Sequence, residues 1–527
     1  MKKLTLLLFL LSTVIAAASE NSTEEQAKDL LLDYLQRNYT TISQSPLRTG
    51  ILYDLVVPIA DLSAYDGRAA QQTVTTRQWL QMSHELRRSA LAESKIPEYK
   101  MLRALGKTEA RERVYPIAVL DYEYNRFRDG ADRETAVMFE NGKITAIDEA
   151  SIEIRRVFAA AALQDWTYRG SRVTFRMNRN ALYFTNFREP VSSLEIDFDD
   201  GLGFRPATDV MTVHYSRTGD KIIRVRASRG DETVESSFRF EVRSLDTPDP
   251  HETWQVTATI PHDGNYSSGE AYVYLSDLHT SITNPIILAE GIDLDDSRNW
   301  DELYDMLNQE GLVEDVRNMG FDIVVLNHGS GTDYIQGNAY LLVELINQVN
   351  AVSADNASII LVGVSMGGQT TRYALTYMET NDMPHHVSTW ISFDSPHKGA
   401  NIPLGIQYWV DFFAGQSSDA GEMRDALNSP AAKQMLLTHF TSPPSANPGP
   451  DPLRADFLND MTSIGSFPEQ MRRVAIANGS GTMQGLDFTP GDQLIRWEYS
   501  SFLVDITGNS WSLNDVQTSV IFDGEIN

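Results

Sequence analysis

The sequence of 527 residues contains no cysteine. Without a thiol the chain can form no disulfide, no thiolate metal site and no cysteine nucleophile, so its stability must come from the size of its buried cores. Basic residues are also scarce, because 44 lysines and arginines stand against 72 aspartates and glutamates, which gives a formal charge of -28. Such an excess of negative charge disfavours nucleic acids and anionic membrane surfaces as partners.

Long apolar runs are missing as well, apart from one at the start of the chain. Two lysines precede an apolar stretch, Leu4 to Ile15, and small residues, Ala16 to Ala18, follow it. The stretch is shorter than the roughly 20 residues that a membrane-spanning helix needs, and the small residues suit cleavage. We therefore predict a signal peptide at residues 1–18, no transmembrane segment, and an exported protein that is secreted, periplasmic or on the outer surface.

The spacing of apolar residues changes twice along the remaining chain. Residues 19–165 mix helical spacing with short strand-like pieces and predict a mixed, partly helical N-terminal region. Residues 166–280 alternate apolar and polar side chains, with turn residues between the runs, which favours a β-sandwich-like domain. From residue 281 uninterrupted apolar strands alternate with helices, a pattern typical of a doubly wound, mostly parallel sheet. We expect a multi-domain chain with an α/β domain at residues 281–527.

The segment Gly363-Val364-Ser365-Met366-Gly367 lies between an apolar β-branched run, Ser358 to Val362, and a helix-favouring run, Gln369 to Thr380. In a strand-to-helix turn of this G-x-S-x-G type, the glycines leave room for a strained serine, and the N-terminus of the following helix faces its hydroxyl. The five letters alone are weak, and the strand and helix around them carry the prediction. Ser365 is our candidate nucleophile for acyl transfer.

An acyl-transfer site also needs two backbone N–H donors for the oxyanion that forms when the serine attacks. One donor is normally the residue after the nucleophile, here Met366. The other normally comes from the loop after an earlier strand, and the turn Glu290-Gly291-Ile292 has the required form. We therefore predict an oxyanion hole formed by Met366 and Ile292.

A third motif completes the pattern. Ile391 to Pro403 contains Pro396-His397-Lys398-Gly399 and is similar to the Pro-His-x-Gly segment that follows the sixth strand in bacterial lipases and GPI-inositol-deacylase-like α/β-hydrolases. Together with the Glu290 turn and the serine segment, it resembles secreted bacterial members of that superfamily over about residues 285–480. The resemblance implies an α/β-hydrolase domain with the activity of a lipase or esterase, and no cofactor.

The acid and the base of such a site are less well defined. The order in this fold is serine, acid, histidine. The resemblance favours Asp487, after the expected seventh strand, as the acid, and Asp394 is the alternative. No histidine follows His439, which is our candidate general base, with His397 as the alternative. The strand-like runs after Asp487 replace the helix and strand that normally deliver the catalytic histidine.

A lid insertion is expected at about residues 400–470. Within it, Ile406, Trp409, Val410 and Phe413 repeat at helical spacing. An aromatic lid would suit acyl chains or aromatic esters, and the alternative is a helix packed on the core.

The leading hypothesis is an exported serine hydrolase, a carboxylic ester hydrolase of lipase or esterase type that forms an acyl-enzyme on Ser365. Its substrate would be an ester or lipid-like small molecule or polymer, and we expect no metal, no cofactor and no nucleic-acid partner. Two alternatives stay open. One is a catalytically incomplete homologue that serves as a surface or binding protein, and the other is an acyltransferase.

Overall fold

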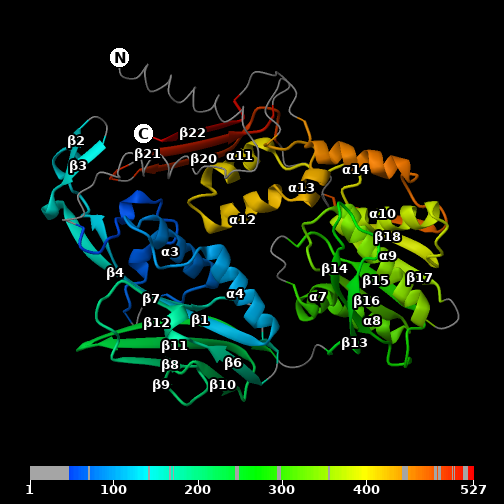
Figure 1. Ribbon diagram of the computed structural model, residues 1–527, viewed down its shortest axis with the longest axis horizontal. Coiled ribbons are helices and arrows are strands. Elements are labelled where there is room, and N and C mark those ends of the chain that lie inside the picture. The colour runs from blue at the N-terminus through cyan, green and yellow to red at the C-terminus, as the bar shows by residue number, and fades with distance from the viewer. Residues whose placement is uncertain are drawn as a thin grey trace.

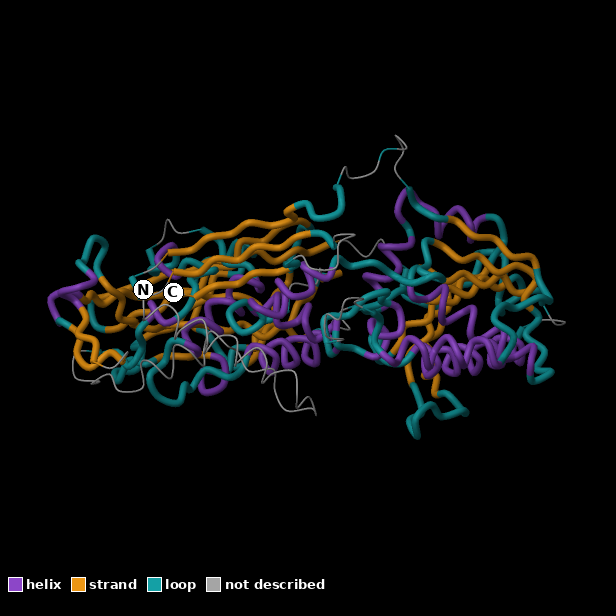
Figure 2. Tube along the Cα trace, turned by 90° about the horizontal axis from the view of Figure 1, so that it is seen from above, coloured by secondary structure: helices purple, strands orange, loops and turns teal. Residues whose placement is uncertain are grey.

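The computed structural model describes residues 47–527 except for 69–71, 141–142, 165–167, 170, 244–247, 294–297, 354–356, 442–448, 480–483, 485–487, 501, 504, 514–519 and 527. The predicted signal peptide and the predicted acid Asp487 lie outside the described residues. An N-terminal body and an α/β body lie side by side along the long axis (Figures 1 and 2). Among the described helices, none has the length and apolarity required to cross a membrane.

The N-terminal body contains two five-stranded sheets. One has the order β10-β6-β1-β4, with β7 beside β1, and the other has the order β5-β12-β11-β8-β9. The strands are β1 (Val114–Phe127), β4 (Ile152–Ala162), β5 (Tyr168–Arg169), β6 (Arg172–Arg176), β7 (Tyr183–Thr185), β8 (Ser193–Asp197), β9 (Arg205–Pro206), β10 (Val210–His214), β11 (Gly219–Arg229) and β12 (Glu232–Arg243). The main helices are α3 (Thr76–Arg88) and α4 (Tyr99–Arg111). Short elements are η1 (Tyr53–Leu55), η2 (Leu62–Ala64), α5 (Arg133–Ala136), β2 (Val137–Glu140), β3 (Lys143–Ile147), η3 (Glu149–Ser151) and α6 (Arg179–Leu182).

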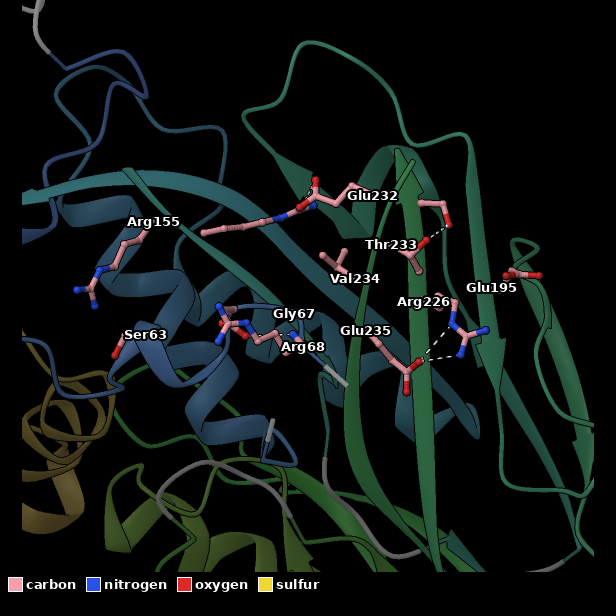
Figure 3. A pocket seen from close by; sticks show the side chains of 13 residues that line it. Ser63, Gly67, Arg68, Arg155, Glu195, Arg226, Glu232, Thr233, Val234 and Glu235 are labelled. Atoms are coloured by element: carbon pink, nitrogen blue, oxygen red, sulfur yellow. Dashed lines mark hydrogen bonds and ion pairs between the residues drawn. The ribbon is translucent and has the colours of Figure 1, made fainter. Parts of the chain in front are cut away.

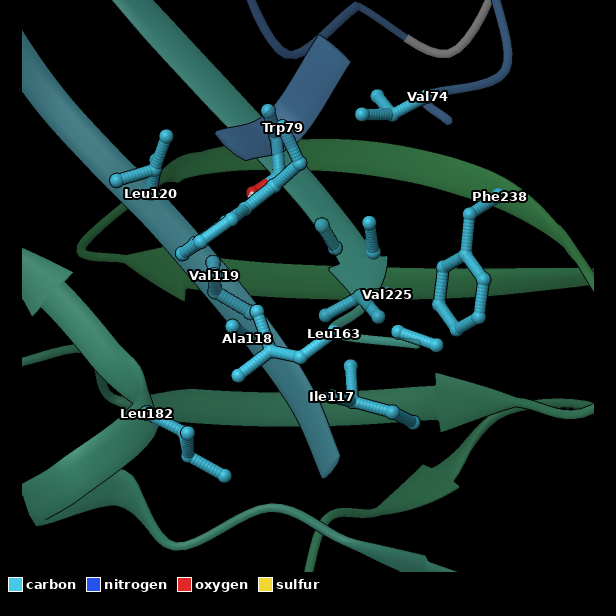
Figure 4. Packing of buried hydrophobic residues seen from close by; sticks show 14 of the residues in the cluster. Val74, Trp79, Ile117, Ala118, Val119, Leu120, Leu163, Leu182, Val225 and Phe238 are labelled. Atoms are coloured by element: carbon cyan, nitrogen blue, oxygen red, sulfur yellow. Dashed lines mark hydrogen bonds between the residues drawn. The ribbon is translucent and has the colours of Figure 1, made fainter. Parts of the chain in front are cut away.

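The two sheets and α3 share one apolar core. Figure 4 shows Trp79 of α3, Val119 of β1, Val225 of β11 and Phe238 of β12 in this core, and each is almost completely buried. Because β1 and β4 belong to it, the domain boundary predicted between residues 165 and 166 needs correction. Most of β1 is buried on both faces, so its sequence lacks the alternation that marks the later strands.

The α/β body is built on a seven-stranded sheet with the order β13-β14-β16-β15-β17-β18-β19. The last five strands in this order are parallel, which confirms the predicted parallel sheet, and β13 and β14 are antiparallel. The strands are β13 (Glu252–Thr257), β14 (Ser268–Tyr274), β15 (Pro285–Ala289), β16 (Asp322–His328), β17 (Ile359–Val364), β18 (Val387–Phe393) and β19 (Arg472–Ile476). The boundary predicted between residues 280 and 281 also needs correction, since the sheet begins at Glu252. β13 is an edge strand with mostly exposed residues, and β14 joins it to β16 in antiparallel pairing.

Helices cover both faces of this sheet. On one face α9 (Ile335–Val352) and α10 (Met366–Thr380) contribute to a core with β15, β16 and β17. On the other face α7 (Trp300–Leu307) and α8 (Leu312–Asn318) pack on β14 and β16, and η4 (Gln309–Gly311) joins the two helices. The insertion between β18 and β19 contains α11 (Leu404–Phe413), α12 (Ser418–Leu427), α13 (Pro430–Met435) and α14 (Pro452–Ser463).

A three-stranded antiparallel sheet ends the chain and lies over α11 and the N-terminal body (Figure 1). Its strands are β20 (Gln493–Ser500), β21 (Asp505–Trp511) and β22 (Phe522–Ile526). The rings of Trp409 and Trp497 are 6.3 Å apart, and those of Phe412 and Phe522 are 5.4 Å apart. Gly508 allows this close approach, because a Cβ there would lie 2.7 Å from the Trp409 ring. The aromatic face of α11 is therefore packed against other parts of the protein. This agrees better with the alternative expectation of a packed helix than with an open aromatic lid.

Candidate active site at the end of β17

Ser365 occupies the turn between β17 and α10 in a strained conformation, with φ 54° and ψ -120°. Its N–H donates to the carbonyl oxygen of Phe393 at the end of β18, at 2.9 Å, and its carbonyl oxygen accepts from the Gly368 N–H at 3.1 Å. The side chain is half-buried. These contacts hold Ser365 at the carboxyl edge of the parallel strands, where ligands bind in open α/β sheets.

Glycines around Ser365 are required by close backbone contacts. A Cβ at Gly363 would overlap the Gly367 carbonyl group, and a Cβ at Gly367 would overlap the carbonyl oxygens of Ala289 and Glu290. These overlaps involve backbone atoms, which cannot move aside as a flexible side chain does. The structure therefore has no room for a side chain at either glycine of the G-x-S-x-G motif.

The predicted oxyanion turn lies directly against the serine. A Cβ on Gly291 would be 3.1 Å from the Cβ of Ser365 and 3.7 Å from its Oγ. Ile292 follows this glycine, and Met366 is the first residue of α10. The first N–H groups of a helix have no intrahelical acceptor, so the Met366 N–H is suited to a substrate oxygen. Met366 and Ile292 stay the predicted donors.

Glu290 connects this turn to the neighbouring strand, which sequence reasoning did not anticipate. Its carboxylate is buried, Oε1 accepts from the His328 N–H at 3.0 Å, and Oε2 lies 3.5 Å from Nη1 of Arg298. Burial raises the pKa of Glu290 to about 7. The only signal in the sequence is its place before Gly291, where many lipases have a histidine.

His439 is not brought to Ser365. Its side chain is completely buried, Nε2 donates to the Leu427 carbonyl oxygen at 2.8 Å, and Nδ1 lies 2.6 Å from Oγ1 of Thr441. Burial lowers the pKa of His439. Both ring nitrogens are therefore used within the insertion, since His439 and both of its partners lie between β18 and β19.

His397 lies closer to the serine turn. Its Nε2 is 2.7 Å from Oγ of Ser392, and Ser392 lies against α10, 2.8 Å from the position of a Cβ on Gly368. Nδ1 of His397 has no hydrogen-bond partner among the described residues. Burial lowers the pKa of His397 to about 4, so the ring is neutral at pH 7. All ten histidines lie in the described part of the chain, and none of them forms a hydrogen bond there with the Ser365 hydroxyl.

The alternative acid Asp394 is exposed at the end of β18. Its carboxylate accepts from the backbone N–H of Asn478 at 3.2 Å and from its Nδ2 at 3.1 Å. These contacts join the loops after β18 and β19, and no described histidine is hydrogen-bonded to Asp394.

A cavity of about 1020 Å³ lies away from this site, in the N-terminal body (Figure 3). Its charged walls are largely neutralised within the protein, for example by the ion pair of Arg226 with Glu235 at 2.9 Å. No group of three or more described histidines and acids is arranged to hold a metal ion.

Comparison with known proteins supports the fold. The family described as "PGAP1-like alpha/beta domain" matches residues 325–419, which contain the end of β16 and all of α9, β17, α10, β18 and α11. Together with the order of the parallel strands, this match confirms the predicted resemblance to α/β-hydrolases. No curated protein matches the sequence.

Among solved structures, Est1E from Butyrivibrio proteoclasticus is 14% identical with a TM-score of 0.20, over 27% of this chain and 50% of its own. The hyperthermophilic esterase from Pyrobaculum calidifontis is 14% identical with a TM-score of 0.25, over 44% and 77%. The lipase BlEst2 from Bacillus licheniformis is 16% identical with a TM-score of 0.19, over 31% and 67%. This chain thus spans half the length of Est1E.

Proposed function

We propose that this protein is an exported serine hydrolase that cleaves carboxylic esters through an acyl-enzyme on Ser365. The observation that carries the proposal is the strained backbone of Ser365, with the Gly291 turn against its side chain. A non-glycine residue in such a conformation costs on the order of 1–3 kcal/mol and persists only where its surroundings impose it. Here the packing of Gly363 and Gly367 imposes it, and the result is a hydroxyl presented at the edge where substrates bind.

In the proposed reaction, Oγ of Ser365 attacks the ester carbonyl carbon and the alcohol leaves. The oxyanion of the tetrahedral intermediate would accept hydrogen bonds from the N–H groups of Met366 and Ile292. Water then attacks the acyl-enzyme and releases the acid. The positive end of the α10 dipole lies at the serine and favours the developing negative charge.

Of the two histidines considered as the base, His397 fits this scheme better. It follows β18 at the same edge of the sheet as Ser365, its ring is neutral at pH 7, and its Nδ1 is without a partner among the described residues. The ring would have to turn away from Ser392 to reach the serine. Asp487 stays the acid expected from the sequence.

Fluorophosphonate labelling of the purified protein, read by mass spectrometry, tests the proposal. We expect one adduct, on Ser365, and hydrolysis of p-nitrophenyl esters that falls by about 10⁴-fold or more in Ser365→Ala, as when other serine hydrolases lose their nucleophile. Ser466→Ala is the matched control, since Ser466 is also half-buried with a positive φ of 70° but lies after α14. The proposal is wrong if the folded wild-type protein neither carries the adduct nor hydrolyses the esters.

One observation favours a second candidate, a catalytically incomplete homologue that binds without hydrolysis. None of the described histidines is hydrogen-bonded to Ser365, whereas an activated serine normally lies within reach of its base. This candidate predicts a cooperatively folded protein with no adduct and no hydrolysis.

A further inference from the structure

A cavity of about 360 Å³, here called the junction pocket, lies where the N-terminal body meets the α/β sheet. Arg113, Tyr115 and Tyr168 line it from the N-terminal body. The other walls come from β13, β14, the end of β16 and the start of α7. The pocket therefore opens at the same carboxyl edge of the parallel strands as Ser365, and both bodies are needed to form it.

A row of hydrogen-bonded side chains crosses the sheet side of the junction pocket. Nε2 of Gln255 donates to Oε1 of Glu270 at 2.7 Å, and the Tyr272 hydroxyl donates to Oε2 of Glu270 at 2.7 Å. Nδ2 of Asn327 donates to the Tyr272 oxygen at 3.3 Å. Because these residues stand on three neighbouring strands, the row is held rigidly and is a preformed polar surface.

Asn327 gives an independent indication of a ligand. The residue is only 8% exposed and lines the pocket, yet its Oδ1 has no hydrogen-bond partner among the described residues. Buried polar atoms in folded proteins nearly always have a partner, so this oxygen is left for a water molecule or a ligand group.

The composition of the walls indicates the chemistry of that ligand. Two cationic side chains, Arg113 and Arg298, stand against two acidic ones, Glu270 and Asp301, so no charge of either sign is favoured. Aromatic side chains, among them Trp300, line the pocket together with hydrogen-bonding groups. Hydroxyl groups both donate and accept, and the C–H faces of a sugar ring pack on aromatic rings, so a carbohydrate meets these requirements. The volume is at the lower end of the range for ligand pockets and fits a small ligand.

The pocket is linked to the serine turn by consecutive contacts. Nδ2 of Asn327 also donates to the carbonyl oxygen of Arg298 at 3.0 Å, and Arg298 forms the ion pair with Glu290, which precedes the Gly291 that contacts Ser365. In the sheet, β15 alone separates β17 from β16, so their ends are roughly 10 Å apart at ordinary strand spacing. A sugar in the pocket would hold an attached ester near Ser365.

We propose that the junction pocket binds the carbohydrate portion of an ester substrate whose carbonyl group reaches Ser365. The part of this statement that concerns the ester rests on the proposed hydrolase function. The N-terminal body then has a direct role in substrate selection, because its residues form one wall of the pocket.

Saturation-transfer NMR of the full chain carrying Ser365→Ala, with cellobiose and N,N′-diacetylchitobiose as probes, measures binding without hydrolysis. We expect saturation of at least one disaccharide, with affinity reduced about tenfold by Glu270→Gln, since one hydrogen bond to a charged group contributes on that order. Arg113→Asn, placed at a backbone φ of 58° that asparagine tolerates, should weaken binding from the other body. Arg217→Asn, an exposed arginine away from the pocket, is the control and should change nothing.

Each result decides one part of the proposal. If neither probe shows saturation, the proposal that the junction pocket binds carbohydrate is wrong. It is also wrong if a probe binds but Glu270→Gln and Arg113→Asn leave its affinity unchanged. Both conclusions hold whether or not the fluorophosphonate labels Ser365. If both variants weaken binding but Ser365 is not labelled, the carbohydrate site is supported and the proposal that its ligand is an ester substrate is wrong. Binding together with labelling supports both parts, and a sugar acetate should then be preferred over p-nitrophenyl acetate, a preference that Glu270→Gln lowers.

Discussion

The carboxyl edge of the sheet differs between its centre and its outer end. At the centre, β15 and β17 are flanked by strands on both sides, and the serine turn is held by contacts of glycines with backbone carbonyl groups. At the outer end, β19 is an edge strand with mostly exposed residues, and the exposed Asp394 is held by Asn478. Ser365 is thus held by backbone packing, whereas Asp394, the alternative acid, is held by side-chain contacts at an exposed edge.

The largest effect on stability is expected from placing a methyl group in the serine turn. Gly367→Ala puts a Cβ onto the carbonyl oxygens of Ala289 and Glu290, and we expect a loss of about 3 kcal/mol in the free energy of unfolding, at the upper end for overpacking. Urea denaturation measures this loss, and labelling of Ser365 should disappear with it.

Gly479→Ala is the matched variant at the outer end, since nothing lies within 4 Å of a Cβ at that exposed position. It should change the free energy of unfolding by less than about 0.5 kcal/mol. Equal losses in the two variants would contradict the distinction between the two parts of the edge.

A smaller effect is expected for Glu290, whose pKa is raised by burial from 4.5 to about 7. The folded protein holds this proton more tightly than the unfolded chain, so the contribution of Glu290 is fully present below pH 4.5 and is lost as the pH rises through 7. Between pH 5 and 7 this loss amounts to about 2 kcal/mol.

Glu290→Gln isolates this contribution from other buried acids such as Glu85, whose pKa burial also raises to about 7. Denaturation of both proteins across this pH range should show a steeper fall in the wild type than in the variant. Parallel pH profiles would mean that Glu290 stays ionised beside Arg298.

The smallest effect is expected from Asp394→Asn. The side chain is exposed, and asparagine can still accept from the Asn478 N–H and tolerates the φ of 47°. We expect a change within about 0.5 kcal/mol in stability and no loss of Ser365 labelling. A fall in ester hydrolysis of about 10⁴-fold would instead identify Asp394 as the acid, because loss of that group has an effect of this size in serine proteases.

Much of the α/β body could be predicted from sequence, because its parallel strands are continuous apolar runs between helices. The serine turn could be predicted for a related reason, since Gly363, Ser365 and Gly367 are close in the chain. The domain boundaries could not. The sheet that β13 and β14 join depends on pairing with strands distant in the chain, and the burial of β1 on both faces removes its alternation.

Sequence patterns also could not predict the hydrogen-bond and ion-pair partners of the histidines and acids. His439 is the last histidine in the chain and was the predicted base, yet its ring nitrogens contact Leu427 and Thr441. Glu290 belongs to a turn that the sequence did indicate, but its contacts with His328 and Arg298 and the burial that raises its pKa could not be predicted from that turn.

The sequence by itself determined the conformation of Ser365 and the parallel strands that present it, since both depend on residue types at short spacing: glycines where the backbone has no room, and apolar runs where strands are buried. Only the tertiary structure decided which side chains surround that serine and that the N-terminal body closes the junction pocket. The physical reason is that these contacts join residues far apart in the chain, such as Arg113 and Asn327, whose proximity depends on how the two bodies pack.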